Sequence, residues 1–227
     1  MPFTEPDFFH WDLKAFVRTV FGPPTCGGTD QGEQDWTEWQ ARFSLLSLPG
    51  EEYAPDLMLR YAAEFCQEAS YWMKPYSGEA FLQGCFWLFS EHGPIGDALY
   101  EYPGIRESKL AFIAGIPSLY VHLSTWKDEV VSMALFGLWD SLCHGFKSGR
   151  HDSMTDELLM IREACKEALA HQLSSQDVLA QDAALHGFNH LAHPKGRAII
   201  QAWVEAHPSL DEPRKGYAWQ CADGKAL

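Results

Sequence analysis

The sequence predicts an all-α protein, organised as an α-α superhelix of stacked antiparallel helix pairs. Apolar residues recur at helical spacing through most of the 227 residues, and no segment alternates apolar and polar residues over the length of a strand. Short turns rich in Gly and Pro separate the helical segments. Helix and turn alternate without a strict sequence period, which favours a degenerate helical-repeat solenoid over a bundle. We expect residues 1–227 to form a single domain.

The clearest helix pair lies within residues 178–208. Its first helix carries small residues, among them Gly187, which let a neighbouring helix come close. Pro194 cannot continue that helix, and Trp203 marks the buried face of the second. Because such a pair cannot bury both of its faces alone, we expect further pairs stacked beside it.

In the N-terminal half we expect helices at residues 8–21, 35–46, 55–72, 78–93 and 95–101. Gly22, followed by two prolines, ends the first of these helices. Pro55 suits the first turn of the third helix. Ser77 is the expected N-cap of the fourth, with Glu79 in its first turn. Pro103 lies in the break that follows the fifth helix.

In the C-terminal half we expect helices at residues 105–122, 127–146 and 154–173, then the pair within 178–208 and a short closing helix at 217–221. Pro117 predicts either a kink in the first of these or two successive helices with a tight junction. Residues 130–146 are nearly all apolar, so we expect a central helix buried on several sides.

Composition indicates an ordinary soluble globular protein, with 46% hydrophobic and 21% charged residues. No apolar run approaches the roughly 20 residues that span a bilayer. The first residues include acids where a signal peptide would be basic, so we expect a cytoplasmic protein. The six cysteines are scattered singly without a C-x-x-C pair, and we expect reduced thiols.

Net charge bounds the possible partners. A charge of −14 argues against direct binding to nucleic acid or to an anionic membrane, since both require basic patches. Residues 29–101 hold 13 acids against three bases, so this segment carries about −10 of the total. A segment this acidic is either a solvated surface or a docking face for a basic partner.

Three histidines form the first candidate site for chemistry. His186, His190 and His193 lie near one helix face, at a spacing that can hold a metal, and Asn189 or Asp182 could complete the ligand set. However, His193 lies at the helix end, where its ring can cap carbonyls, and the segment has no glutamate of an H-E-x-x-H motif. We therefore expect capping and core packing, with no bound metal and no cofactor.

Asp140 and His144 form the second candidate. They lie at helical spacing within the apolar segment 130–146, where a buried carboxylate needs a partner. A carboxylate that orients an imidazole is half of a nucleophilic triad. The sequence has no G-x-S-x-G motif and no cysteine in a reactive motif, so we expect a structural pair and no enzymatic activity.

Two segments carry a resemblance to a family. ALHGFNHLAHP, followed by GRAIIQAWVEAHP, resembles the C-terminal hairpin of a widespread set of bacterial helical-repeat proteins. The matching residues are Ala184, Leu185, His186, Gly187, His190, Leu191, Pro194 and Ile200. FLQGCFWLFSEHGPIGDALYE is similar to their middle segment, whereas Phe188 and Asn189 depart from the more regular glycine-containing pattern. The resemblance implies a HEAT-like or armadillo-like superhelix, and many members look like immunity proteins, small acidic partners of secreted antibacterial toxins.

Charge and resemblance together predict a non-catalytic binding protein that neutralises a cognate secreted bacterial toxin, a basic protein such as a nuclease. We expect the contact surface at the turn 27–34 and at nearby acids. These are Asp30, Glu33, Asp35, Glu38, Glu51, Glu52, Glu91, Asp97 and Glu101. Two alternatives stay open: a helical-repeat scaffold in another bacterial complex, and a metal-dependent enzyme that uses the three histidines.

Overall fold

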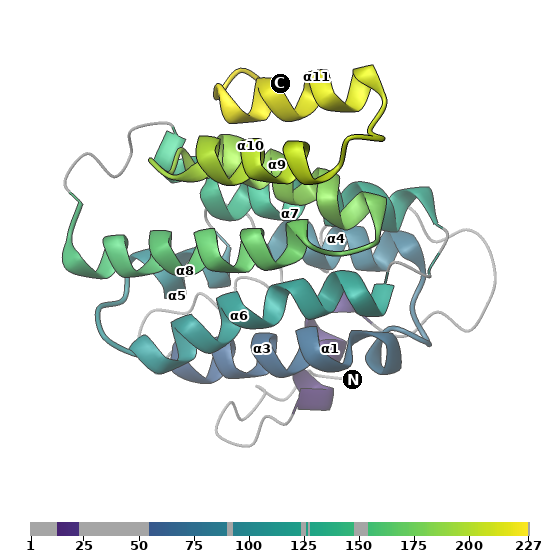
Figure 1. Cartoon of the computed structure of the whole chain (residues 1–227). Coiled ribbons are helices and arrows are strands. Elements are labelled where there is room, and N and C mark those ends of the chain that lie inside the picture. The colour runs from purple at the N-terminus through teal and green to yellow at the C-terminus, as the bar shows by residue number, and fades with distance from the viewer. Residues whose placement is uncertain are drawn as a thin grey trace, which may run out of the picture.

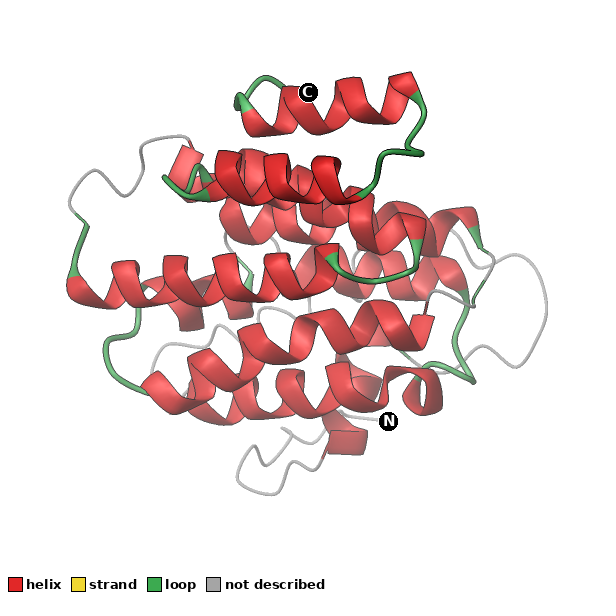
Figure 2. Ribbon diagram, in the orientation of Figure 1, coloured by secondary structure: helices red, strands yellow, loops and turns green. Residues whose placement is uncertain are grey.

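The computed structural model describes residues 13–22, 55–89, 93–123, 126, 128–147 and 154–226. Within these ranges all regular secondary structure is helical and no strand occurs, which confirms the all-α prediction (Figure 2). The helix expected at residues 35–46 lies outside the described residues, as does the start of the helix expected at residues 8–21.

The described helices match the expected segments closely. They are α1 (Leu13–Phe21), α3 (Pro55–Trp72), α4 (Gly78–Phe89), α5 (Pro94–Tyr100), α6 (Arg106–Leu123), α7 (Glu129–Lys147), α8 (Asp156–Leu173), α9 (Val178–Leu191), α10 (Gly196–Ala206) and α11 (Glu212–Ala222). Helix α6 continues through Pro117 as one helix. Helix α3 has an unpredicted kink at Glu68, whose φ of −124° and ψ of 18° are not helical.

Short polar side chains fix where several helices begin. The Ser77 hydroxyl accepts a hydrogen bond from the backbone N–H of Ala80 at 3.2 Å, which confirms the expected cap of α4. The carboxylate of Asp177 accepts the N–H of Ala180 at 2.8 Å and so caps α9. Asp211 caps α11 in the same way. These caps give the chain defined turns between packed helices.

The helices lie in two rows (Figure 1). In one row α3 contacts α6, α6 contacts α8, and α8 contacts α10; in the other, α4 contacts α7, α7 contacts α9, and α9 contacts α11. The rows are joined by contacts such as those of α8 with α9 and of α10 with α11. From α6 to α11, helices that follow one another along the chain therefore alternate between the rows, whereas α1 and α5 each contact both α3 and α4.

Helix α7 is buried on several sides, as expected, but one of its faces is exposed. One face is buried, with Trp139 fully enclosed and its Nε1–H donating to Gln172 Oε1 of α8 at 2.8 Å. On the opposite face Met133 is 58% exposed, and the side chains of Asp140 and His144 are 42% and 50% exposed. Packing against α4 and α9 and the bond from Trp139 to α8 agree with the expected burial on several sides, while the face that carries Met133 and His144 is left to solvent.

Small residues allow the closest helix approaches. A Cβ on Gly187 would lie 2.6 Å from Leu169 Cδ2 of α8 and 2.8 Å from Trp139 Cβ of α7, so α9 reaches both helices only because this position lacks a side chain. This confirms the role expected of Gly187. A Cβ on Gly84 of α4 would likewise lie 2.3 Å from Phe21 Cδ1 of α1.

Lys109 is a buried cation within the core. Its side chain is 1% exposed, and its ammonium group donates to the carbonyl of Tyr102 at 2.5 Å and to Glu157 Oε1 at 2.6 Å. Glu157 lies in the first turn of α8 and is 32% exposed. This pair ties α6 to the start of α8. None of the helices in the described part of the chain has an apolar stretch of the length that crossing a membrane requires.

Candidate functional site

Two of the nine expected contact acids lie in the described part of the chain. Asp97 is in the first turn of α5, and Glu101 follows that helix as its C-cap, with its N–H bonded to the Asp97 carbonyl at 2.9 Å. Glu101 is exposed and Asp97 is partly buried. The other seven, Asp30, Glu33, Asp35, Glu38, Glu51, Glu52 and Glu91, lie outside the described residues.

The outer side of α3 combines acidic groups with an exposed aromatic ring. Glu64 and Glu68 are exposed, and Tyr71 is 62% exposed. Ser70 of α3 shares a hydrogen bond with His122 of α6 at 3.3 Å, which joins the C-terminal ends of the two helices. We call the exposed residues Glu64, Glu68 and Tyr71 the α3 face. The position of Tyr71 was not predicted, because its helical spacing is also compatible with the core.

The three histidines of α9 and its C-terminal end do not face one site. His186 is 5% exposed; its ring stacks on Phe136 with centroids 4.7 Å apart, and its Nδ1 shares a hydrogen bond of 3.2 Å with the Tyr217 hydroxyl. His193 contacts Glu163 of α8 at 3.0 Å. Core packing of His186 is therefore confirmed. The three rings do not meet in one place, because His193 turns to Glu163 whereas His186 and His190 lie together with ring centroids 4.7 Å apart.

Arg162, and not His193, caps the carbonyls at the C-terminal end of α9. His193 accepts a hydrogen bond from the N–H of Lys195 at 3.1 Å instead of capping carbonyls. The carbonyls of Leu191 and Ala192 are bound by the guanidinium of Arg162 from α8. Ala192 adopts the left-handed conformation with φ of 48°, which ends the helix.

His190 turns toward α7 and joins the pair expected there. Its Nδ1 lies 3.1 Å from Asp140 Oδ1, and the same oxygen lies 3.7 Å from His144 Nδ1. The side chain of His190 is 13% exposed, whereas Asp140 and His144 are about half-exposed. We call Asp140, His144 and His190 the α7–α9 cluster. Asp140 and His144 do face each other, but the expectation that they are buried is wrong.

Burial keeps the inner imidazoles neutral. It lowers the pKa of His190 to about 4, although Asp140 acts in the opposite direction; His186, Lys147 and His144 add to the lowering. Burial also lowers the pKa of His186 and of His193, the latter against the effect of Glu163. These side chains are therefore mostly uncharged at neutral pH and become charged more readily in the unfolded chain.

Acid is expected to destabilise the fold through these histidines. A group with a depressed folded pKa favours the folded state above its unfolded pKa, near 6.5 for histidine. That stability is lost as the pH falls from about 6.5 toward the His190 value of about 4. The melting temperature, measured by circular dichroism with EDTA in the buffer, should fall between pH 7 and pH 5. His190→Gln should flatten this dependence, whereas His171→Gln, at an exposed position of α8, should not.

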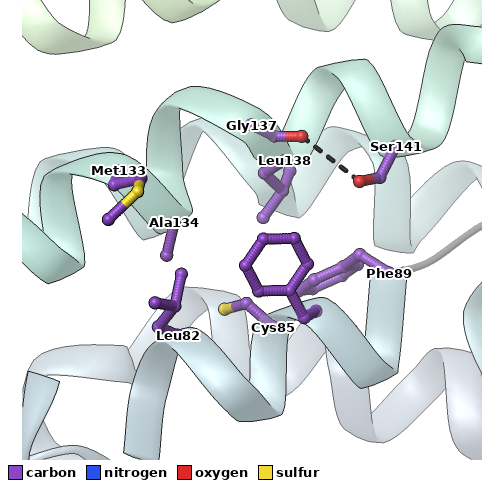
Figure 3. A pocket seen from close by; sticks show the side chains of 9 residues that line it. Leu82, Cys85, Phe89, Met133, Ala134, Gly137, Leu138 and Ser141 are labelled. Carbon is purple, nitrogen blue, oxygen red and sulfur yellow. Dashed lines mark hydrogen bonds between the residues drawn. The ribbon is translucent and has the colours of Figure 1, made fainter. Parts of the chain in front are cut away.

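A shallow pocket between α4 and α7 is too small to hold a metabolite (Figure 3). It has a volume of about 30 Å³, enough for one or two water molecules. Apolar side chains such as Leu82, Phe89 and Leu138 line it, and the Ser141 hydroxyl donates to the Gly137 carbonyl at 3.3 Å. Cys85 also lines the pocket, but burial raises the pKa of its thiol well above the ordinary value, so the thiol is protonated at neutral pH and is a poor nucleophile.

Comparison with known proteins adds no family to this picture. No protein-family model matches the sequence, and no curated protein or solved structure matches it. The candidate sites in the described residues are the α3 face with its neighbouring acids and the α7–α9 cluster.

Proposed function

We propose that this protein is a non-catalytic binding protein that neutralises a cognate secreted bacterial toxin, a basic protein such as a nuclease. The observation that carries the proposal is the distribution of charge, with about −10 of the net −14 in residues 29–101. An acidic surface complements the basic substrate groove of a nuclease and accelerates association by electrostatic steering. Occupation of that groove requires no chemistry from the binding protein.

The described acids of this region support a contact surface on α3 and at the end of α5. Glu64, Glu68 and Glu101 are exposed, so their charges are available to a partner. Tyr71 adds an exposed aromatic ring, and aromatic residues are enriched among the groups that dominate binding energy in interfaces. Lys74 lies over this ring, 5.8 Å from its centroid, so a partner would meet the ring beside one base as well as the acids.

We also propose that the two rows of helices form a HEAT-like superhelix and that the protein acts in the cytoplasm. Alternation of consecutive helices between the rows supports the first proposal. Preformed helices would lose little conformational entropy on binding. Location in the cytoplasm is supported by free buried thiols, which are expected in a reducing compartment. These thiols belong to Cys66, Cys85, Cys143, Cys165 and Cys221.

Charge reversal tests the placement of the contact surface. The partner is first captured from a lysate of the native host. At low salt, the variant Glu64→Lys, Glu68→Lys, Glu101→Lys should bind it with an association rate at least about 10-fold lower, because steering is lost. Tyr71→Ala should instead mainly raise the dissociation rate.

The matched control reverses three exposed acids elsewhere, Glu167→Lys, Glu205→Lys, Glu212→Lys, so that the change in net charge is the same. Equal association rates for the two triple variants would refute the placement on α3 and α5. Co-expression with the captured partner tests the function itself. Binding without protection of growth would identify a scaffold and overturn the proposal of toxin neutralisation.

A further inference from the structure

We propose that Asp140, His144 and His190 bind a divalent transition-metal ion, with zinc as the best-suited candidate, and that this ion links α7 to α9. The proposal concerns a site separate from the α3 face. It is tested on the purified protein alone, so its outcome does not depend on whether a toxin partner exists.

The donor atoms are already close to the arrangement that a metal requires. They all lie within 4.8 Å of one another, and Asp140 Oδ1 is 3.1 Å from His190 Nδ1 and 3.7 Å from His144 Nδ1. Tetrahedral zinc with ligand bonds of about 2.0–2.1 Å places its ligand atoms roughly 3.3–3.4 Å apart. The two separations from Asp140 Oδ1 bracket this value, and the donors of His144 and His190 lie within 4.8 Å of each other, so side-chain rotations would complete the arrangement.

The two inner atoms also lack a hydrogen-bond partner among the described residues. Asp140 Oδ1 and His190 Nδ1 are themselves buried, and although 3.1 Å separates them they are not aligned for a hydrogen bond. Buried polar atoms are normally paired, because an unpaired one loses its hydration without compensation. An ion bound to both atoms would satisfy them together.

The donor types select the class of metal. Two imidazoles and one carboxylate suit zinc and related transition ions, whereas magnesium and calcium prefer sets made of oxygen ligands. Asp140 and His144 lie one helical turn apart on α7, which suits chelation, and His190 supplies the third ligand from α9. Because Asp140 and His144 are about half-exposed, the fourth position would be open to water.

Two further groups act on this site. Lys147 donates to Asn189 Oδ1 at 3.1 Å, and its charge is close enough to lower the pKa of both His186 and His190. That charge opposes a bound cation. The ring of His186 lies against His190 with centroids 4.7 Å apart, and the Nδ1 of His186 is engaged by the Tyr217 hydroxyl. His186 therefore positions His190 and is not a ligand through Nδ1.

Calorimetric titration of the EDTA-treated, dialysed protein with ZnCl₂ tests the site. One Zn²⁺ should bind per chain, and substitution by Co²⁺ should give the visible absorption of a tetrahedral ion. His190→Gln and His144→Ala should each weaken binding at least about 10-fold. Lys147→Gln should tighten it several-fold, because the opposing charge is removed.

His193→Gln is the matched control, since this ring faces Glu163 and should leave zinc affinity unchanged. His144 is half-exposed, so His144→Ala should stay folded even if His190→Gln unfolds. Circular dichroism verifies that each variant is folded. Absence of stoichiometric zinc binding would overturn the proposal. Equal zinc affinity in the wild type and His144→Ala would overturn it as well, as would loss of binding in the His193→Gln control.

Discussion

Replacing Glu157 with alanine is expected to lower the free energy of unfolding by about 3 kcal/mol. The reason is that the buried ammonium group of Lys109 would lose its counter-charge. Lys109 is 1% exposed, and among the described residues its ammonium group would keep the Tyr102 carbonyl as its hydrogen-bond acceptor. A buried charge without a counter-charge is far more costly than the loss of an exposed ion pair. Urea denaturation followed by circular dichroism measures the change.

Asp156→Ala is the matched control for this effect, because Asp156 is exposed and lies in the same first turn of α8. It removes the favourable interaction with the helix N-terminus, worth about 0.5 kcal/mol, without leaving a cation unpaired. The double variant Lys109→Met, Glu157→Ala should regain much of the lost stability, since methionine fills the space of the lysine stem. Equal losses for Glu157→Ala and Asp156→Ala would contradict this account.

Gly187→Val should destabilise the fold by about 3 kcal/mol, and Gly187→Ala by about 1–2 kcal/mol. The first added carbon already meets Trp139 Cβ at 2.8 Å, and an atom so near the backbone cannot yield by side-chain rotation alone. Valine adds two further methyl groups to the same space. The helices α7 and α9 must therefore move apart, and contacts of the buried Trp139 are lost.

Gly216→Ala makes the same chemical change but is expected to stabilise the fold. Gly216 lies within α11, and a Cβ there would have no atom within 4 Å. Alanine should stabilise that helix by up to about 1 kcal/mol, since glycine is a poor helix former. Thermal melts of the two alanine variants should shift in opposite directions. An unchanged or raised melting temperature in Gly187→Ala would show that close packing at Gly187 is unimportant.

Local features of the fold could be predicted from the sequence. The positions of the described helices and the Ser77 cap depend on residues near one another in the chain, and these predictions are confirmed, although α11 begins at Glu212 and not at residue 217. The small residue at Gly187 correctly predicted a close helix approach, but its neighbours Leu169 and Trp139 are distant in the chain. Burial of Lys109 was not predicted, because a lysine in an amphipathic helix normally faces solvent. Its environment arises only when α8 brings Glu157 to it.

In the candidate sites, too, local spacing could be predicted from the sequence, whereas contacts between helices could not. Spacing along α7 correctly placed His144 beside Asp140, and spacing along α9 put His186, His190 and His193 near one helix face. Which of those rings meets Asp140 depends on how α9 crosses α7, and no local pattern encodes that crossing. The exposure of Asp140 was not predicted for a related reason. An apolar sequence predicts a buried helix, but it does not show which sides of the helix its neighbours leave uncovered.

The alternation of helices between two rows has a kinetic consequence. Every substantial contact joins helices no more than three places apart in the order of the described chain. Loops closed by such contacts are short relative to the whole, and proteins rich in local contacts fold fast for their size. Each newly synthesised helix therefore finds its partners among those just made, so the chain can acquire structure progressively while it is still leaving the ribosome.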